Sequence, residues 1–135
     1  MTQRSGTTGG TLLVVLILVV LTACSSASRP TVAEWQPAWD QLVGGIPAAS
    51  ELGQPPDRSI CSQGLELVRS SQAGLFPTPD RAIDEAVKEW VSVAEDAFFE
   101  CPPSSRAIPD MDFAYGQLAR LEAEVNAVLA IDRSQ

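Results

Sequence analysis

Few residues in this chain of 135 have the types and spacing that catalysis requires. Histidine is absent, which excludes Ser-His-Asp and Cys-His nucleophilic arrangements and metal sites built on imidazole. Ser92 lies four residues after Lys88, the spacing of a Ser-Lys dyad, but both face solvent on a helical wheel and are better explained as exposed polar residues. No glycine-rich phosphate loop follows a strand. The sequence therefore predicts no catalytic residue, no cofactor and no enzymatic activity.

Acidic and aromatic side chains suggest binding instead. Four acidic residues share one predicted helix face and could hold a cation weakly, although a solvated face is the simpler interpretation: Glu85, Glu89, Asp96 and Glu100. We therefore expect no metal site. Trp90 is centred on an apolar stripe and is expected to pack in the core. Trp35 and Trp39 lie in a short segment, and the wheel places Phe99 away from the core. These last three are candidates for a contact surface.

Cys24 ends the longest apolar run of the chain. The core of that run, residues 12–21, would span about 15 Å as a helix, half of the ~30 Å of a bilayer core. This length, Arg4 before the run and the small residues after it are typical of a secretory signal peptide. Residues 21–24, Leu-Thr-Ala-Cys, resemble the lipobox of bacterial lipoproteins, in which the cysteine carries a diacylglycerol and becomes the first residue. The resemblance implies a signal peptide over 1–23, lipid attachment at Cys24 and a location on the extracytoplasmic face of the cell membrane.

An uncleaved membrane anchor and a secreted protein with an unmodified cysteine are the alternatives. A lone thiol beside a cleavage site is a liability in an oxidising compartment, so lipidation explains it better. The mature chain, residues 24–135, carries 17 acidic and eight basic residues, a formal charge of −9. Such a surface disfavours nucleic acid and does not attract anionic lipid, which leaves the acyl chains as the membrane contact.

The other two cysteines, Cys61 and Cys101, are expected to form a disulfide outside the cytoplasm. A metal site would need more ligands, and a redox-active pair more often has the Cys-x-x-Cys spacing. Closing a loop of about 40 residues, the bond could contribute about 3 to 4 kcal/mol.

Helical spacing of apolar residues predicts an all-α domain over 34–135, a small bundle of three to four helices behind a lipidated tether over 24–33. Thr31 and Glu34 fit a capping box for the first helix. A proline deep inside a helix removes a backbone hydrogen bond, so a start near Pro37 is favoured over a start after Thr31.

Stronger helix signals follow. Asp57 is the expected N-cap of a helix over 58–72, although Gly64 costs this helix about 1 kcal/mol relative to alanine. Thr78 is the expected N-cap of the third helix, which the proline pair at 102–103 ends.

The third helix gathers its apolar residues within an arc of about 120°. They are Ile83, Ala86, Val87, Trp90, Ala94, Ala97, Phe98 and Cys101. A last helix is predicted over 111–132. If the second and third helices are antiparallel neighbours, Cys61 near the start of one can meet Cys101 at the end of the other.

Residues 75–103, LFPTPDRAIDEAVKEWVSVAEDAFFECPP, resemble small actinobacterial lipoproteins that have no assigned activity. The resemblance implies a disulfide-stapled helical domain and gives no catalytic residues. Two functions remain: a non-enzymatic interaction or assembly partner of an envelope protein or, as the alternative, a bundle that binds a small hydrophobic or carbohydrate ligand. An apolar cavity among the three tryptophans would favour the ligand. A filled core with an exposed Phe99 would favour the partner.

Overall fold

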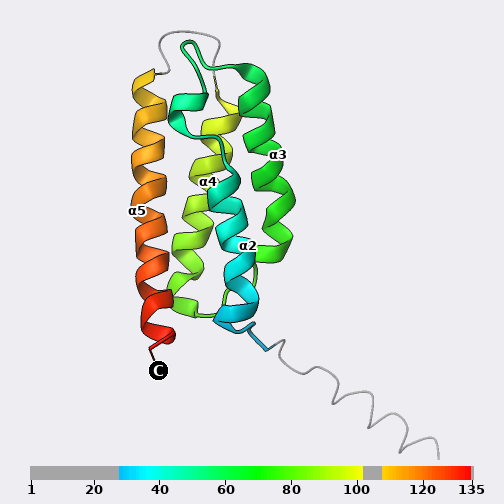
Figure 1. Cartoon of the computed structure of the whole chain (residues 1–135), viewed down its shortest axis with the longest axis vertical. Helices are drawn as coiled ribbons and strands as arrows, with labels where there is room; N and C mark the ends of the chain where they lie inside the picture. Colours follow the sequence, from blue (N-terminus) through cyan, green and yellow to red (C-terminus); the bar gives the residue numbers. More distant parts are fainter. Residues whose placement is uncertain (1–27, 102–107, 135) are drawn as a thin grey trace, which may run out of the picture.

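A computed structural model describes residues 28–101 and 108–134, and over these residues the protein is an all-helical bundle (Figure 1). The α-helices are α2 (Val32–Gly45), α3 (Arg58–Leu75), α4 (Asp84–Phe99) and α5 (Ile108–Asp132), with 3-10 helices η2 (Ala49–Glu51) and η3 (Arg81–Ile83). The predicted fold class is confirmed. Within the described ranges, none of the helices is long and apolar enough to cross a membrane. The predicted signal peptide, Cys24 and the proline pair at 102–103 lie outside the described residues.

Helix α2 begins directly after Thr31, so the predicted start near Pro37 is wrong. The Thr31 hydroxyl accepts the Glu34 backbone N–H at 3.3 Å, and the Glu34 carboxylate accepts the Thr31 backbone N–H at 2.8 Å, which completes the capping box. Pro37 removes one hydrogen bond, to the carbonyl of solvent-exposed Ala33. Capping and the burial of Trp35 in the first turn outweigh that loss.

Helix α3 begins where the sequence predicts and ends three residues later than expected. The Asp57 carboxylate accepts the Ser59 backbone N–H at 2.7 Å, which confirms Asp57 as the N-cap. At the other end, Leu75 is buried, and its carbonyl accepts the Trp35 indole N–H at 2.8 Å. This packing extends α3 beyond the end predicted at residue 72.

Helix α4 begins later than predicted, and Thr78 is not its N-cap. Thr78 is the buried polar residue of the described core, and its hydroxyl contacts the Asp84 carboxylate and the Asp80 carbonyl instead of accepting a backbone N–H from a first turn. Asp80 instead caps η3, accepting the Ala82 backbone N–H at 2.8 Å. The chain therefore forms a short 3-10 turn before the α-helix.

Helix α4 packs against both α3 and α5, and all four α-helices contribute to one core (Figure 1). The predicted apolar arc of α4 is confirmed, with Ala97 half-buried and the other members buried. Helix α5 contributes Met111, Leu118, Leu121, Val125 and Leu129 to the core. The core therefore runs the length of the bundle, on either side of α4.

The two ends of the bundle differ. At one end, which we call the disulfide end, the start of α3 meets the end of α4, and Cys61 and Cys101 lie at disulfide-bonding distance with their Cα atoms 6.1 Å apart. The predicted pairing is therefore present. At the other end, the terminal end, α2 begins, the chain turns between α3 and η3, and α5 ends (Figure 1).

Candidate functional site

Phe99 lies at the disulfide end, on the last residue of α4, and its side chain is 70% exposed. Beside it, a surface hollow of about 420 Å³ lies along the start of α3 and the end of α4. It is lined by Arg58, Cys61, Ser62, Leu65, Phe98, Phe99, Glu100 and Cys101. Leu65 and Phe99 make part of the surface of this hollow apolar, and Arg58 and Glu100 place opposite charges among the residues around it. An apolar surface bordered by charges is typical of a protein interaction site.

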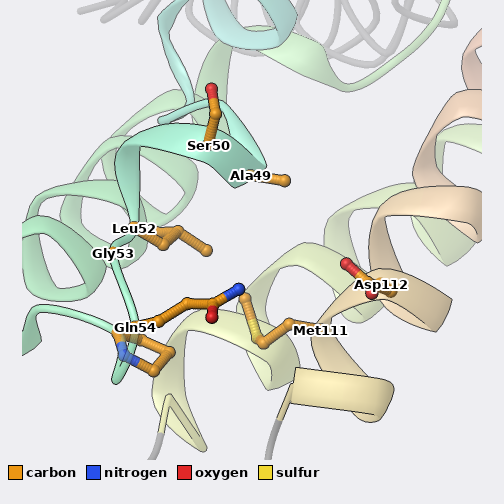
Figure 2. Close-up of a pocket in the computed structure, with 8 residues that line it drawn as sticks. Ala49, Ser50, Leu52, Gly53, Gln54, Met111 and Asp112 are labelled. Carbon is orange, nitrogen blue, oxygen red and sulfur yellow. The ribbon is translucent and has the colours of Figure 1, made fainter.

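A smaller hollow of about 140 Å³ opens at the same end, between the α2–α3 connection and the start of α5 (Figure 2). Leu52 and Gln54 border it from the connection, and Met111 and Asp112 border it from α5 (Figure 2). Phe113, one residue further along α5, is 67% exposed. Exposed aromatic side chains therefore occur on both α4 and α5 at the disulfide end.

Tyr115 holds the α2–α3 connection against α5. Its hydroxyl donates a hydrogen bond to the carbonyl of Pro47, and its ring meets Phe98 edge-on with the centroids 6.4 Å apart. Burial, with a smaller contribution from Glu51, raises the pKa of Tyr115 to about 12. This tyrosine thus fixes the connection from which one wall of the smaller hollow is built.

Trp35 and Trp39 are buried, so the prediction that they belong to a contact surface is wrong. Their rings stack with centroids 5.6 Å apart, and Trp39 meets Trp90 edge-on at 5.3 Å. The error follows from the misplaced helix start, because a helix beginning at Pro37 loses the turn that carries Trp35 inward. Neither of the two hollows is lined by a tryptophan. The three rings fill the space in which the ligand hypothesis required a cavity.

Lys88 and Ser92 are both exposed on α4. The Lys88 ammonium donates to the Glu85 carboxylate at 2.7 Å, and this hydrogen-bonded ion pair raises the pKa of Lys88. A lysine that serves as a general base needs a lowered pKa. The geometry therefore gives no support to a Ser-Lys dyad.

The acidic residues considered as weak cation ligands, Glu85, Glu89, Asp96 and Glu100, do not form a metal site. All four are on the surface, with Glu85 paired to Lys88 and Glu89 paired to Arg120 at 3.3 Å. Among the residues that the structure describes, no three His, Cys, Asp or Glu side chains come close enough to hold a metal ion. These carboxylates form a solvated face opposite the core.

Arg29 makes a contact that sequence reasoning missed. Its guanidinium forms two hydrogen bonds with the Asp84 carboxylate, at 2.8 and 3.0 Å, and also donates to the Thr78 carbonyl at 2.9 Å and hydroxyl at 3.1 Å. The Thr78 hydroxyl in turn contacts Asp84. We call these three residues the Arg29 clamp. No local pattern could have revealed it, because Arg29 and Asp84 are 55 residues apart.

The Arg29 clamp changes the predicted tether. Arg29 was expected in a segment with nothing to pack against, but it is bound to the fold, and Val32 already belongs to α2. Bidentate arginine–carboxylate pairs are among the stronger polar contacts in proteins. The Arg29 hydrogen bonds, followed by that of Thr78, hold the pKa of Asp84 well below its ordinary value of 3.8. Arg29 therefore belongs to the folded domain.

Two hollows and the exposed rings of Phe99 and Phe113 lie at the disulfide end, and the Arg29 clamp lies at the terminal end. Lipid attachment at Cys24 stays a prediction, since that residue lies outside the described part of the chain. The chain matches no protein-family model, and comparisons with curated proteins and with solved structures give no significant match.

Proposed function

We propose that the protein is a lipid-anchored, non-enzymatic interaction or assembly partner at the outer face of the cytoplasmic membrane. The anchor would be Cys24, as the lipobox resemblance at residues 21–24 implies. Two or more acyl chains hold a protein stably at a bilayer, whereas one binds marginally. The domain behind the anchor would then act by contact with an envelope protein rather than by chemistry.

The exposed Phe99 beside a filled core is the observation that carries this proposal. The disulfide end lies at the opposite end of the bundle from the start of α2, the first helix after the proposed anchor in the sequence (Figure 1). An apolar side chain of the partner would enter the larger hollow and pack against Leu65 and Phe99. Aromatic side chains that become buried in a complex, as Phe99 would, dominate the energetics of many interfaces.

The alternative, a small ligand held between the helices, has less support. Its expected cavity among the tryptophans is occupied by the three indole rings themselves. The larger hollow lies at the surface beside the exposed Phe99, where a protein side chain has easy access.

Site-specific photo-crosslinking on intact membranes tests the contact surface. A photoreactive phenylalanine analogue at Phe99 should give a discrete protein adduct, and the same analogue at Gln41, exposed midway along α2, should not. Reversing the charge beside the hollow with Arg58→Glu should weaken the Phe99 adduct. Equal adducts at both positions, or none at Phe99, would count against the proposed surface.

The anchor has a separate test. Intact-mass analysis of membrane-extracted protein should show the loss of residues 1–23 and the gain of a diacylglycerol. A Cys24→Ala protein should be neither processed at that bond nor retained by membranes. Retention of this variant with the same cleavage would refute the anchor.

A further inference from the structure

We infer that the terminal end of the bundle rests on the lipid surface, and that the Arg29 clamp fixes this orientation. The inference depends on the proposed lipid anchor at Cys24. It concerns a second surface, on the opposite end of the molecule from Phe99, and its partner is the headgroup layer of the membrane.

The length of the chain between the anchor and the fold is the first argument. Five residue steps separate Cys24 from Arg29, and a fully extended chain covers at most about 18 Å over that distance. Without the Arg29 clamp the free segment would reach the start of α2 at Val32, eight steps away, or about 29 Å. The clamp thus removes more than a third of the possible reach.

The length of the bundle is the second argument. Helix α5 has 25 residues and is therefore about 38 Å long. A domain of that length on a connection of about 18 Å cannot turn over to bring its disulfide end to the membrane. The bundle then contacts the membrane either with its terminal end or with one of its sides.

The sides of the bundle are unsuited to an anionic membrane surface. Exposed or half-buried carboxylates project along all four helices, at Asp40 on α2, Glu66 on α3, Asp96 on α4 and Glu122 on α5. The basic residues on these sides, Arg69, Lys88 and Arg120, are each paired with a carboxylate. The negative potential of anionic lipid repels such faces. Lying on a side is therefore disfavoured by charge.

The terminal end has a different chemistry. It exposes two large apolar side chains, Phe76 at 37% and Ile131 at 61%, and two guanidinium groups, those of Arg81 and Arg133. Apolar side chains enter the region between headgroups and acyl chains, and arginine pairs with lipid phosphates. This combination fits a lipid headgroup layer.

Carboxylates are also present at the terminal end. Glu34, Asp80 and Asp132 are exposed there, so three carboxylates outnumber the two arginines and this end carries no net positive charge. Electrostatic attraction alone would therefore not hold the terminal end at the membrane. The short connection between Cys24 and Arg29 does so by keeping that end at a high local concentration near the lipid surface. Lengthening the connection should therefore release it.

Hydrogen exchange of the full acylated protein tests this orientation. In vesicles of phosphatidylcholine and phosphatidylglycerol, backbone amides in residues 75–83 and 128–134 should exchange several-fold more slowly than in detergent. Amides in residues 46–57, at the disulfide end, should exchange alike in both.

The decisive variant carries a flexible Gly-Ser spacer of about ten residues between Ser26 and Ala27. It should lose the protection by vesicles, whereas the same spacer between Ser104 and Ser105 should preserve it. Intact mass is recorded for every sample. Acylated protein with no protection, or protection that survives the first spacer, overturns the inference and leaves the anchor standing. Protein without lipid on Cys24 overturns the anchor and the inference together.

Discussion

The ring of Phe98 occupies the space that a side chain on Gly64 would need. A Cβ built on Gly64 would lie 2.9 Å from both Cδ1 and Cε1 of Phe98, closer than real side chains approach. This contact lies one turn from the Cys61–Cys101 pair, at the disulfide end. A glycine that weakens α3 as an isolated helix therefore allows α3 and α4 to pack closely where they are bonded.

Gly64→Ala should lower the free energy of unfolding by about 1 to 3 kcal/mol, because Phe98 is buried and has little room to move. Gly116→Ala is the matched control. It lies inside α5 with no atom within 4 Å of its would-be Cβ, and should raise stability by about 0.5 to 1 kcal/mol. Urea denaturation measures both, and stabilisation by both substitutions would contradict the close contact.

Removing the disulfide with Cys61→Ser and Cys101→Ser should lower stability by about 2 to 5 kcal/mol. Both cysteines are buried, so neither should react with an alkylating reagent in the native protein. Non-reducing peptide mapping should recover the two cysteine peptides linked. Ready alkylation of the folded protein, or equal denaturation midpoints for the two forms, would show that the bond is absent.

Trp35 and Trp90 are equally buried but differ in hydrogen bonding. The Trp35 Nε1–H donates to the Leu75 carbonyl at 2.8 Å, whereas the Trp90 Nε1–H has no partner among the described residues. Trp35→Phe loses that bond and leaves a buried carbonyl unpaired, so it should destabilise by about 1 to 3 kcal/mol more than Trp90→Phe. Equal losses in thermal or chemical denaturation would argue against this difference.

The Arg29 clamp predicts an acid-sensitive contribution to stability. Since the folded pKa of Asp84 lies below its ordinary value of 3.8, the clamp stabilises fully above that value and less as pH falls below it. The difference in unfolding free energy between the wild type and Asp84→Asn should be constant above about pH 5 and shrink in more acid solution. A difference that does not change between pH 6 and about pH 2 would contradict the ion pair.

Tyr115 is the only tyrosine, so its titration can be followed directly by ultraviolet absorbance. The folded protein should titrate near 12, and the unfolded protein near the ordinary value of 10.0. Because the pKa of Tyr115 is raised in the folded protein, its neutral hydroxyl favours the folded state. This contribution to stability is complete below the unfolded pKa of 10.0 and is lost as pH rises toward 12. Tyr115→Phe should cost about 1 kcal/mol at neutral pH through the lost bond to Pro47. A folded titration near the ordinary value would refute the burial of this hydroxyl.

The elements that sequence reasoning placed well are those whose apolar residues repeat at helical spacing. Helix α4 shows this most clearly, because its buried stripe from Ile83 to Cys101 is set by periodicity alone. The same stripe turned Cys101 inward and correctly predicted where it would meet Cys61. The N-cap at Asp57, which depends only on neighbouring residues, was also predicted correctly.

The errors arose where tertiary contacts outweighed local preferences. Pro37 argued against the first turn of α2, but burial of Trp35 stabilises that turn. Thr78 has the appearance of an N-cap, yet its hydroxyl is used by the Arg29 clamp. Such contacts join residues about 50 positions apart, and a reading of neighbouring residues contains no information about them.

The tryptophan cluster has an optical consequence. All three tryptophans of the chain lie in one group, two on α2 and one on α4. Excitation energy absorbed by any of these rings passes readily to its neighbours, so the intrinsic fluorescence reports on a single place where α2 packs against α4. Separation of α2 from the other helices would change that emission without any added label, and the molecule therefore contains its own reporter of this interface.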